Sequence, residues 1–113
     1  SAFNQDISSW DVSNVTTMYQ MFAQSAFNQD ISTWDVSSVN DMENMFTSSS
    51  FNQPISSWDV SNVTNMGYMF FAATSFNQDL SSWSVDNVTS CVSFSTNAPL
   101  TEANTPNFTN CTP

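Results

Sequence analysis

The chain repeats one unit four times, and this repetition constrains its fold more than any other feature. The copies begin at Phe3, Phe27, Phe51 and Phe76, which stand 24, 24 and 25 residues apart. The third copy reads F-N-Q-P-I-S-S-W-D-V-S-N-V-T-N-M-G-Y-M-F. A period of this length, with large apolar residues at fixed positions, is typical of proteins whose repeats stack, so that each sequence position becomes a column.

Within one unit the spacing of apolar residues changes from strand-like to helix-like. Ile7 and Trp10 lie in a stretch whose aromatic and β-branched residues favour an extended strand. Val15, Met18 and Phe22 then recur at intervals of three and four residues, the spacing of one helical face. We therefore predict an α/β solenoid: a right-handed, leucine-rich-repeat-like coil with one short parallel strand and one short helix per 24–25-residue unit.

Columns of large apolar residues form the predicted core, because their phase agrees from copy to copy. An aromatic ligand-binding strip is the less favoured interpretation, and methionine is adaptable enough to fill gaps in a core. The predicted core residues are Trp10, Trp34, Trp58, Trp83, Met18, Met42, Met66, Phe22, Phe46 and Phe70.

The repeats are predicted to occupy residues 1–94 as four rungs, starting near residues 3, 27, 51 and 76. Residues 95–113 are predicted to cap the C-terminal end, since terminal repeats need such cover. The N-terminal end is bare in this arrangement, so we expect further repeats or further copies of the chain beside it.

The third copy contains the motif W-D-V-S-N-V-T-x-M-x-x-M-F, preceded by F-N-Q-x-I-S-S. This unit resembles the repeats of the BspA-like leucine-rich-repeat surface proteins of bacteria and some protists, and the likeness covers residues 1–94. The resemblance implies a secreted or surface-attached protein involved in adhesion. It does not imply a defined ligand.

Charge limits the partners of the chain. It contains no Lys, Arg or His, and its ten acidic residues give a formal charge of −10. Such a surface repels phosphate backbones and anionic lipids, so we expect neither nucleic-acid binding nor electrostatic membrane binding. No apolar run approaches the length of a membrane span, so we expect no direct membrane insertion. The same composition leaves no ordinary base for a Ser or Cys nucleophile and no cationic clamp, so we do not expect an enzyme.

The two cysteines, Cys91 and Cys111, lie near the C-terminus. A zinc site built from them would lack ligands because the chain has no His. We predict instead that they form a disulfide, which indicates an oxidising setting and an extracellular or cell-surface location.

Polar columns leave several alternatives open. An amide column is predicted to form a structural ladder, with a ligand-binding strip as the alternative. It consists of Asn4, Asn28, Asn52 and Asn77, beside Gln5, Gln29, Gln53 and Gln78. Hydroxyl columns that include Ser8, Ser32, Ser56 and Ser81 are predicted to be a soluble face, with an ice- or glycan-binding face as the alternative.

Two acidic columns are predicted to supply turn and cap acceptors, with calcium binding as the alternative. The columns are Asp6, Asp30, Pro54 and Asp79, and Asp11, Asp35, Asp59 and Ser84. Each column lacks one acid, so no metal or other cofactor is part of the preferred interpretation.

The favoured function is an extracellular or cell-surface module for adhesion, which binds a surface protein or glycan without catalysis. The alternatives are a structural spacer, a filament-forming array, and a calcium- or ice-binding solenoid.

Overall fold

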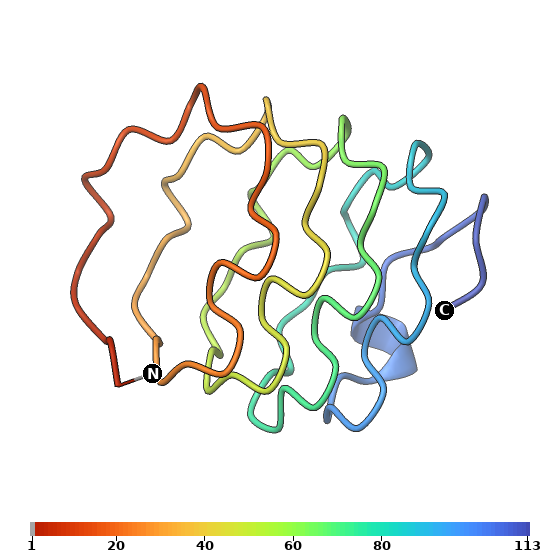
Figure 1. Ribbon diagram of the computed structural model, residues 1–113. Coiled ribbons are helices and arrows are strands. Elements are labelled where there is room, and N and C mark those ends of the chain that lie inside the picture. The colour runs from red at the N-terminus through yellow and green to blue at the C-terminus, as the bar shows by residue number, and fades with distance from the viewer. Residues whose placement is uncertain (1) are drawn as a thin grey trace.

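Four repeats lie side by side along the molecule in the computed structural model, which describes residues 2–113 (Figure 1). Each copy completes one circuit before the next begins beside it. Isolated parallel bridges join equivalent positions of neighbouring copies: Thr17 to Asp41, Asp41 to Asn65, and Asn65 to Ser90. The molecule measures 35 × 30 × 20 Å.

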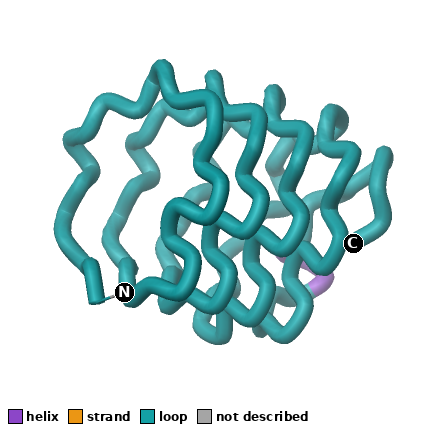
Figure 2. Tube along the Cα trace, viewed as in Figure 1, coloured by secondary structure: helices purple, strands orange, loops and turns teal. Residues whose placement is uncertain are grey.

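Regular secondary structure is almost absent from residues 2–113 (Figure 2). The one helix or strand there is η1, a 3-10 helix at Glu102–Asn104. The predicted α/β solenoid, a right-handed leucine-rich-repeat-like coil with one parallel strand and one helix per unit, is therefore wrong. No helix among the described residues has the length and apolarity that a membrane crossing requires.

Tight turns replace the predicted helix in residues 18–24. The N–H of Met21 donates to the carbonyl of Met18 at 3.1 Å, and the N–H of Ala23 donates to the carbonyl of Gln20 at 3.2 Å. Gln20 and Gln24 have φ angles of 57° and 55°, and a right-handed helix cannot continue through such residues. The positive-φ residues recur at two positions per copy: Gln20, Gln24, Asn44, Ser48, Tyr68, Ala72, Ser93 and Asn97.

Backbone N–H groups that have no partner within these turns form hydrogen bonds with the next repeat. The N–H groups of residues 18, 20, 22 and 24 donate to the carbonyls of residues 41, 43, 45 and 47, at 2.8–3.0 Å. The same pattern joins residues 42–48 to residues 65–71 and residues 66–72 to residues 90–96. We call the segments 18–24, 42–48, 66–72 and 91–97 the turn ladder. All of its bonds between repeats run in one direction, from an N–H to a carbonyl of the following copy.

In the predicted strand, side chains take over the bonds that a sheet would make between backbones. The N–H of Asn28 donates to the side-chain Oδ1 of Asn4 at 2.9 Å. The carbonyl of Ile7 accepts a bond from the indole Nε1 of Trp34 at 3.1 Å and a turn bond from the N–H of Trp10 at 3.1 Å. Neighbouring copies are therefore not paired backbone to backbone here, and no sheet forms.

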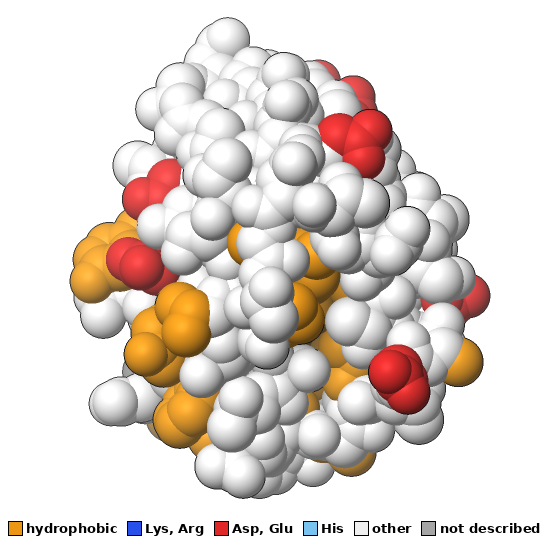
Figure 3. Space-filling view, turned by 90° about the vertical axis from the view of Figure 1, so that its right-hand side faces the viewer, with side chains coloured by type: hydrophobic (Ala, Val, Ile, Leu, Met, Phe, Trp, Pro, Cys, Tyr) orange, Lys and Arg blue, Asp and Glu red, His pale blue; other side chains and the backbone are white. Residues whose placement is uncertain are grey.

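Residues 98–113 lie across the C-terminal end of the fourth copy. The carbonyl of Asn104 accepts a bond from the N–H of Leu80 at 2.9 Å. The ring of Phe108 packs edge-on against Phe94, with centroids 5.0 Å apart. Figure 3 looks onto this end, where acidic side chains stand apart from one another.

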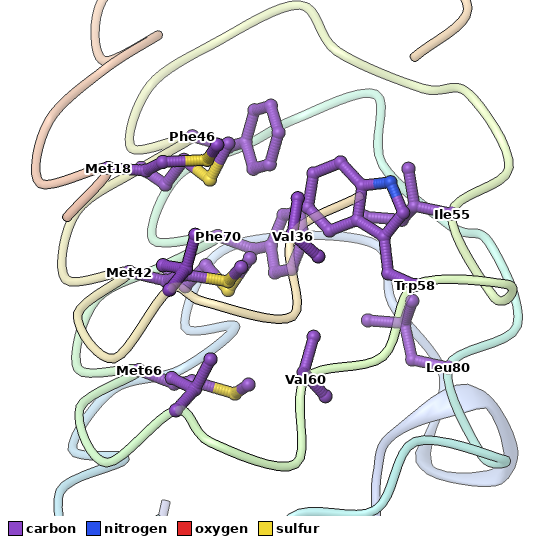
Figure 4. Packing of buried hydrophobic residues seen from close by; sticks show 14 of the residues in the cluster. Met18, Val36, Met42, Phe46, Ile55, Trp58, Val60, Met66, Phe70 and Leu80 are labelled. Atoms are coloured by element: carbon purple, nitrogen blue, oxygen red, sulfur yellow. The ribbon is translucent and has the colours of Figure 1, made fainter. Parts of the chain in front are cut away.

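Columns of aromatic rings and methionines fill the interior. The rings of Phe27 and Phe51 are stacked with centroids 6.2 Å apart, and Phe46 lies against Phe51 with centroids 4.3 Å apart. Burying an aromatic side chain of this kind stabilises a fold by roughly 1.5–3 kcal/mol. Figure 4 shows the methionine column, formed by Met18, Met42 and Met66, beside the rings of Phe46 and Phe70.

Candidate functional site

Nine of the ten predicted core side chains are buried, and Trp10 is the exception, with 56% of its surface exposed. Every other tryptophan packs on the preceding copy and donates its indole N–H to a carbonyl there. The three pairs are Trp34 with Ile7, Trp58 with Ile31, and Trp83 with Ile55, at 3.0–3.1 Å. Trp10 stands in the first copy, so no preceding copy covers it. Its assignment to the core is wrong for this reason.

The amide column joins each copy to the next. The Oδ1 of Asn28 accepts bonds from the N–H of Asn52 at 2.8 Å and from the side-chain Nε2 of Gln53 at 3.2 Å. The same arrangement recurs along the column and ends at Asn77, whose Oδ1 accepts from the N–H of Thr101 and the Nδ2 of Asn104. These amide oxygens are engaged within the fold, as a structural ladder requires.

Carboxylates of the second acidic column accept bonds from the turn that follows each of them. The Oδ1 of Asp35 accepts from the N–H and the Oγ of Ser37, at 3.0 and 2.6 Å. These bonds, first the side-chain one, hold the pKa of Asp35 below its usual value, although Asp59 and Asp11 act in the opposite direction. Hydrogen bonding therefore outweighs repulsion between the copies. The equivalent pairs are Asp11 with Ser13 and Asp59 with Ser61.

The first acidic column uses the same local turn. Its carboxylates accept bonds from the N–H two residues ahead, in the pairs Asp6 with Ser8, Asp30 with Ser32, and Asp79 with Ser81, all at 2.9 Å. Pro54 interrupts this column and is exposed. Residues 2–113 contain no group of three or more carboxylates or thiols placed to hold a metal ion.

A pocket of about 300 Å³ opens at the N-terminal end of the stack. Its lining residues are Phe3, Ile7, Trp10, Met21, Phe22, Ala23 and Ser25. Phe3 and Met21 are exposed, whereas their equivalents in the second copy, Phe27 and Met45, are completely buried beneath the first copy. The pocket is thus the surface on which a preceding copy would lie.

The outer face of the turn ladder differs from copy to copy. The position of Tyr19 is held by Glu43, Gly67 and Val92 in the other copies. The position of Gln20 is held by Asn44, Tyr68 and Ser93. We call these eight residues the variable face. The columns that begin at Phe3, Asn4 and Trp10 hold one residue type in all four copies, so the fold depends on those columns and leaves the variable face free.

Several apolar side chains on or beside the variable face are open to solvent. Tyr19 is 50% exposed and Val92 is 48% exposed. Tyr68 is also exposed, and its ring meets the half-buried ring of Phe71 edge-on, with centroids 5.6 Å apart. Positions that agree between copies give no sign of this face in the sequence. The signal lay in the two positions after each of Met18, Met42, Met66 and Cys91, which hold a different residue in every copy.

The predicted disulfide is confirmed. Cys91 and Cys111 are bonded, with their Cα atoms 5.9 Å apart and a sequence separation of 20. The bond ties residues 98–113 to the fourth segment of the turn ladder.

Comparison with known proteins adds a family but no function. The model of a family described as "Mycoplasma protein of unknown function, DUF285" matches residues 1–108. No match was found among curated proteins or among solved structures. Because the match spans the whole repeat array and most of the C-terminal segment, the chain belongs to the DUF285 family.

Proposed function

We propose that this protein is a non-catalytic extracellular or cell-surface module that binds a surface protein or a glycan through its variable face. The observation that carries the proposal is the contrast between columns. Amide oxygens and most carboxylates form bonds inside the repeat array, whereas the variable face changes in every copy and exposes apolar side chains. Positions that a repeated fold does not need are available for recognition.

The chemistry of the variable face suits recognition of an uncharged or polar partner. Tyr68 combines an apolar ring with a polar hydroxyl, and tyrosine is enriched at binding interfaces for this reason. Asn44 and Ser93 stand at the equivalent position in neighbouring copies. The Nδ2 of Asn44 donates to the Oγ1 of Thr47 at 3.0 Å, so its amide oxygen and the hydroxyl of Ser93 are the groups that suit a partner. With no cationic residue in the chain, binding would depend on shape, apolar contact and neutral hydrogen bonds rather than on ion pairs.

The extracellular part of the proposal rests on the disulfide and on the resemblance to BspA-like surface proteins. Disulfides persist in oxidising compartments and are rare where thiols are kept reduced. The motif W-D-V-S-N-V-T-x-M-x-x-M-F resembles repeats of surface proteins involved in adhesion, and adhesion is therefore the role we propose.

The non-catalytic part rests on composition and on the state of the carboxylates. The chain has no His, Lys or Arg, and side-chain bonds from Ser13 and Ser37 hold the pKa values of Asp11 and Asp35 below the usual range. A general acid or base that acts near neutral pH needs a pKa shifted in the opposite direction.

A binding screen tests the proposal. The labelled 113-residue chain is applied to a glycan array and to a panel of immobilised surface proteins, and each hit is measured again with Tyr68→Ser. The substitution is matched to the fold because Ser93 holds the same position, with the same positive φ, in the fourth copy. Loss of an interface tyrosine typically weakens binding by about tenfold or more.

Pro54→Asp is the control, since it restores the residue of the other three copies away from the variable face. Binding that is lost with Tyr68→Ser and kept with Pro54→Asp supports the proposal. Hits that both variants retain in full would place recognition elsewhere, and a screen without hits would contradict a binding role.

A further inference from the structure

The turn ladder leaves acceptors without donors at the N-terminal end of the molecule. In the second copy, the carbonyls of residues 41, 43, 45 and 47 each accept an N–H from the first copy. The equivalent carbonyls of the first copy belong to Thr17, Tyr19, Met21 and Ala23, and none of them accepts a bond from another residue in the range 2–113. These four carbonyls form the acceptor edge.

At the other end, the ladder leaves donors without acceptors. The N–H groups of residues 66, 68, 70 and 72 donate to the fourth copy. The equivalent N–H groups of the fourth copy belong to Cys91, Ser93, Ser95 and Asn97, and none of them donates to a residue of the described chain. Cys91 is only 1% exposed, so the N–H groups of the half-buried Ser93 and Ser95 and of the exposed Asn97 form the donor edge. Residues 98–113 cover the core of this end without closing the donor edge.

We propose that whole chains of this protein associate head to tail, with the donor edge of one chain pairing with the acceptor edge of the next chain. The register follows from the three internal interfaces, where each N–H meets the carbonyl one position before its own equivalent. The expected pairs are Ser93 with Tyr19, Ser95 with Met21, and Asn97 with Ala23, because Cys91 is buried and bonded to Cys111. Exposed rows of unpaired backbone groups are the usual templates for such pairing.

Side chains beside the two edges fit the same arrangement. Val92 at the donor edge and Tyr19 at the acceptor edge belong to one column, and each exposes about half of its surface. In the proposed register Val92 of one chain would lie on Tyr19 of the next chain. The pocket at the N-terminal end would meet residues 98–113, where Leu100 and Phe108 are only half-buried. Covering Trp10 and Phe3 in this way removes exposed aromatic surface from water.

Direction and charge distinguish this assembly from other modes of association. A head-to-head dimer would place acceptor edge against acceptor edge and form no ladder bonds. A head-to-tail interface uses two different surfaces, so it leaves one free edge at each end and can continue with further copies. The charge of −10 on each chain opposes association between chains, and salt screens this repulsion. Association is therefore expected to increase with protein concentration and with added sodium chloride.

Sedimentation and light scattering of the 113-residue chain test whether copies associate. The weight-average mass is expected to rise with concentration, and more steeply in high salt. Tyr19→Glu is expected to weaken association by about tenfold, because it adds a like charge at the interface. The fold accepts this residue, since Glu43 holds the same position in the second copy. Ser56→Glu is the control, because it adds the same charge at an exposed site away from both edges.

A crosslinking experiment tests the register. The double variant Tyr19→Cys/Val92→Cys is expected to form a reducible ladder of multimers under mild oxidation, because the two positions would be adjacent across the interface. Ser56→Cys/Val92→Cys is expected to form no such ladder. The single variant Tyr19→Cys could also form crosslinked dimers. If it does so as fast as the double variant forms multimers, the contact is head to head and the proposal is contradicted. A chain that stays monomeric in high salt at millimolar concentration and forms no ladder would also overturn it.

Discussion

The indole N–H of Trp34 donates a hydrogen bond to the backbone carbonyl of Ile7, 3.1 Å away, across the boundary between the first and second copies. Trp34 is only 4% exposed, so both groups are shielded from water. The same bond recurs at Trp58 and Trp83. One side chain therefore fills the core and also satisfies a backbone group that a sheet would have paired, which explains how the stack holds together without strands.

Trp34→Phe is expected to lower the free energy of unfolding by about 0.5–1.5 kcal/mol, because the carbonyl of Ile7 loses its indole donor and keeps only the turn bond from the N–H of Trp10. Trp34→Ala should cost about 3–5 kcal/mol, since it also opens a cavity. Urea denaturation followed by circular dichroism measures both changes. Trp10→Phe is the control and should change stability by less than about 0.5 kcal/mol, because Trp10 is exposed. Equal effects of Trp34→Phe and Trp10→Phe would show that the bond contributes nothing.

Asn52→Ala is expected to destabilise the chain by about 1–2 kcal/mol, because its Oδ1 accepts bonds from the N–H of Asn77 and the Nε2 of Gln78. Asn52→Asp keeps an acceptor oxygen at this position and should therefore reduce stability less than Asn52→Ala does. Thermal unfolding by calorimetry compares the two variants with Asn14→Ala, a substitution at an exposed asparagine outside the column. If Asn52→Ala and Asn14→Ala unfold at the same temperature, the amide column is not structural.

Ala72 lies in the left-handed region, with φ of 55°. Ala72→Val is expected to cost about 1–2 kcal/mol or more, because a β-branched side chain clashes with the backbone in this conformation. Ala72→Gly should be neutral or stabilising, since glycine adopts positive φ freely. Denaturant midpoints provide the measurement. Ala26→Val, at an exposed alanine without positive φ, is the matched control and should change the midpoint little.

Acid is expected to weaken the fold through the carboxylates that accept turn bonds. Bonds from Ser13 and Ser37 hold the folded-state pKa values of Asp11 and Asp35 below the ordinary value of an aspartate. A lowered folded-state pKa means that the unfolded chain binds more protons near this pH. The contribution to stability is therefore complete above the unfolded pKa and is lost as pH falls through the folded pKa.

Urea midpoints between about pH 7 and pH 2 measure this dependence. The triple variant Asp11→Asn/Asp35→Asn/Asp59→Asn keeps an oxygen acceptor in each turn but cannot titrate there. Its midpoint should change less steeply with pH than that of the unaltered chain. Identical pH profiles would show that these carboxylates are not the groups responsible.

Cys111→Ser is expected to destabilise the chain by about 3 kcal/mol, the stabilisation typical of a disulfide that closes a loop of this length. The two cysteines are separated by 20 positions in the sequence, so the disulfide constrains only the C-terminal part of the chain. Melting with and without dithiothreitol measures the change. The reductant should lower the melting temperature of the unaltered chain and leave that of Cys111→Ser unchanged. A melting temperature of the unaltered chain that does not respond to reductant would contradict the expectation.

Sequence reasoning predicted the disulfide between Cys91 and Cys111 and the burial of Trp34, but it failed over residues 18–24. Val15, Met18 and Phe22 have helical spacing, and a series of turns that places every third or fourth side chain inward satisfies the same pattern. Gln20 and Gln24 give no warning of positive φ, because glycine is the residue that signals it and the one glycine, Gly67, lies elsewhere in the repeat.

Trp10 shows a second limit of sequence reasoning. Its column is identical in all four copies, yet only Trp34, Trp58 and Trp83 are buried. A column predicts which residues meet when copies stack. Whether a given member is covered depends on its neighbour along the stack, and the first member has none in this chain.

By itself, the sequence determined which residues recur in phase and which side chains would meet between copies, because a strict period places equivalent residues in register. The tertiary structure alone decided how the backbone is paired. In the turn ladder, N–H groups reach the carbonyls of the following copy, and elsewhere Asn4 and Trp34 supply side-chain partners in place of a sheet. Backbone groups are the same in every residue, so their partners depend on what lies beside them after the copies have stacked.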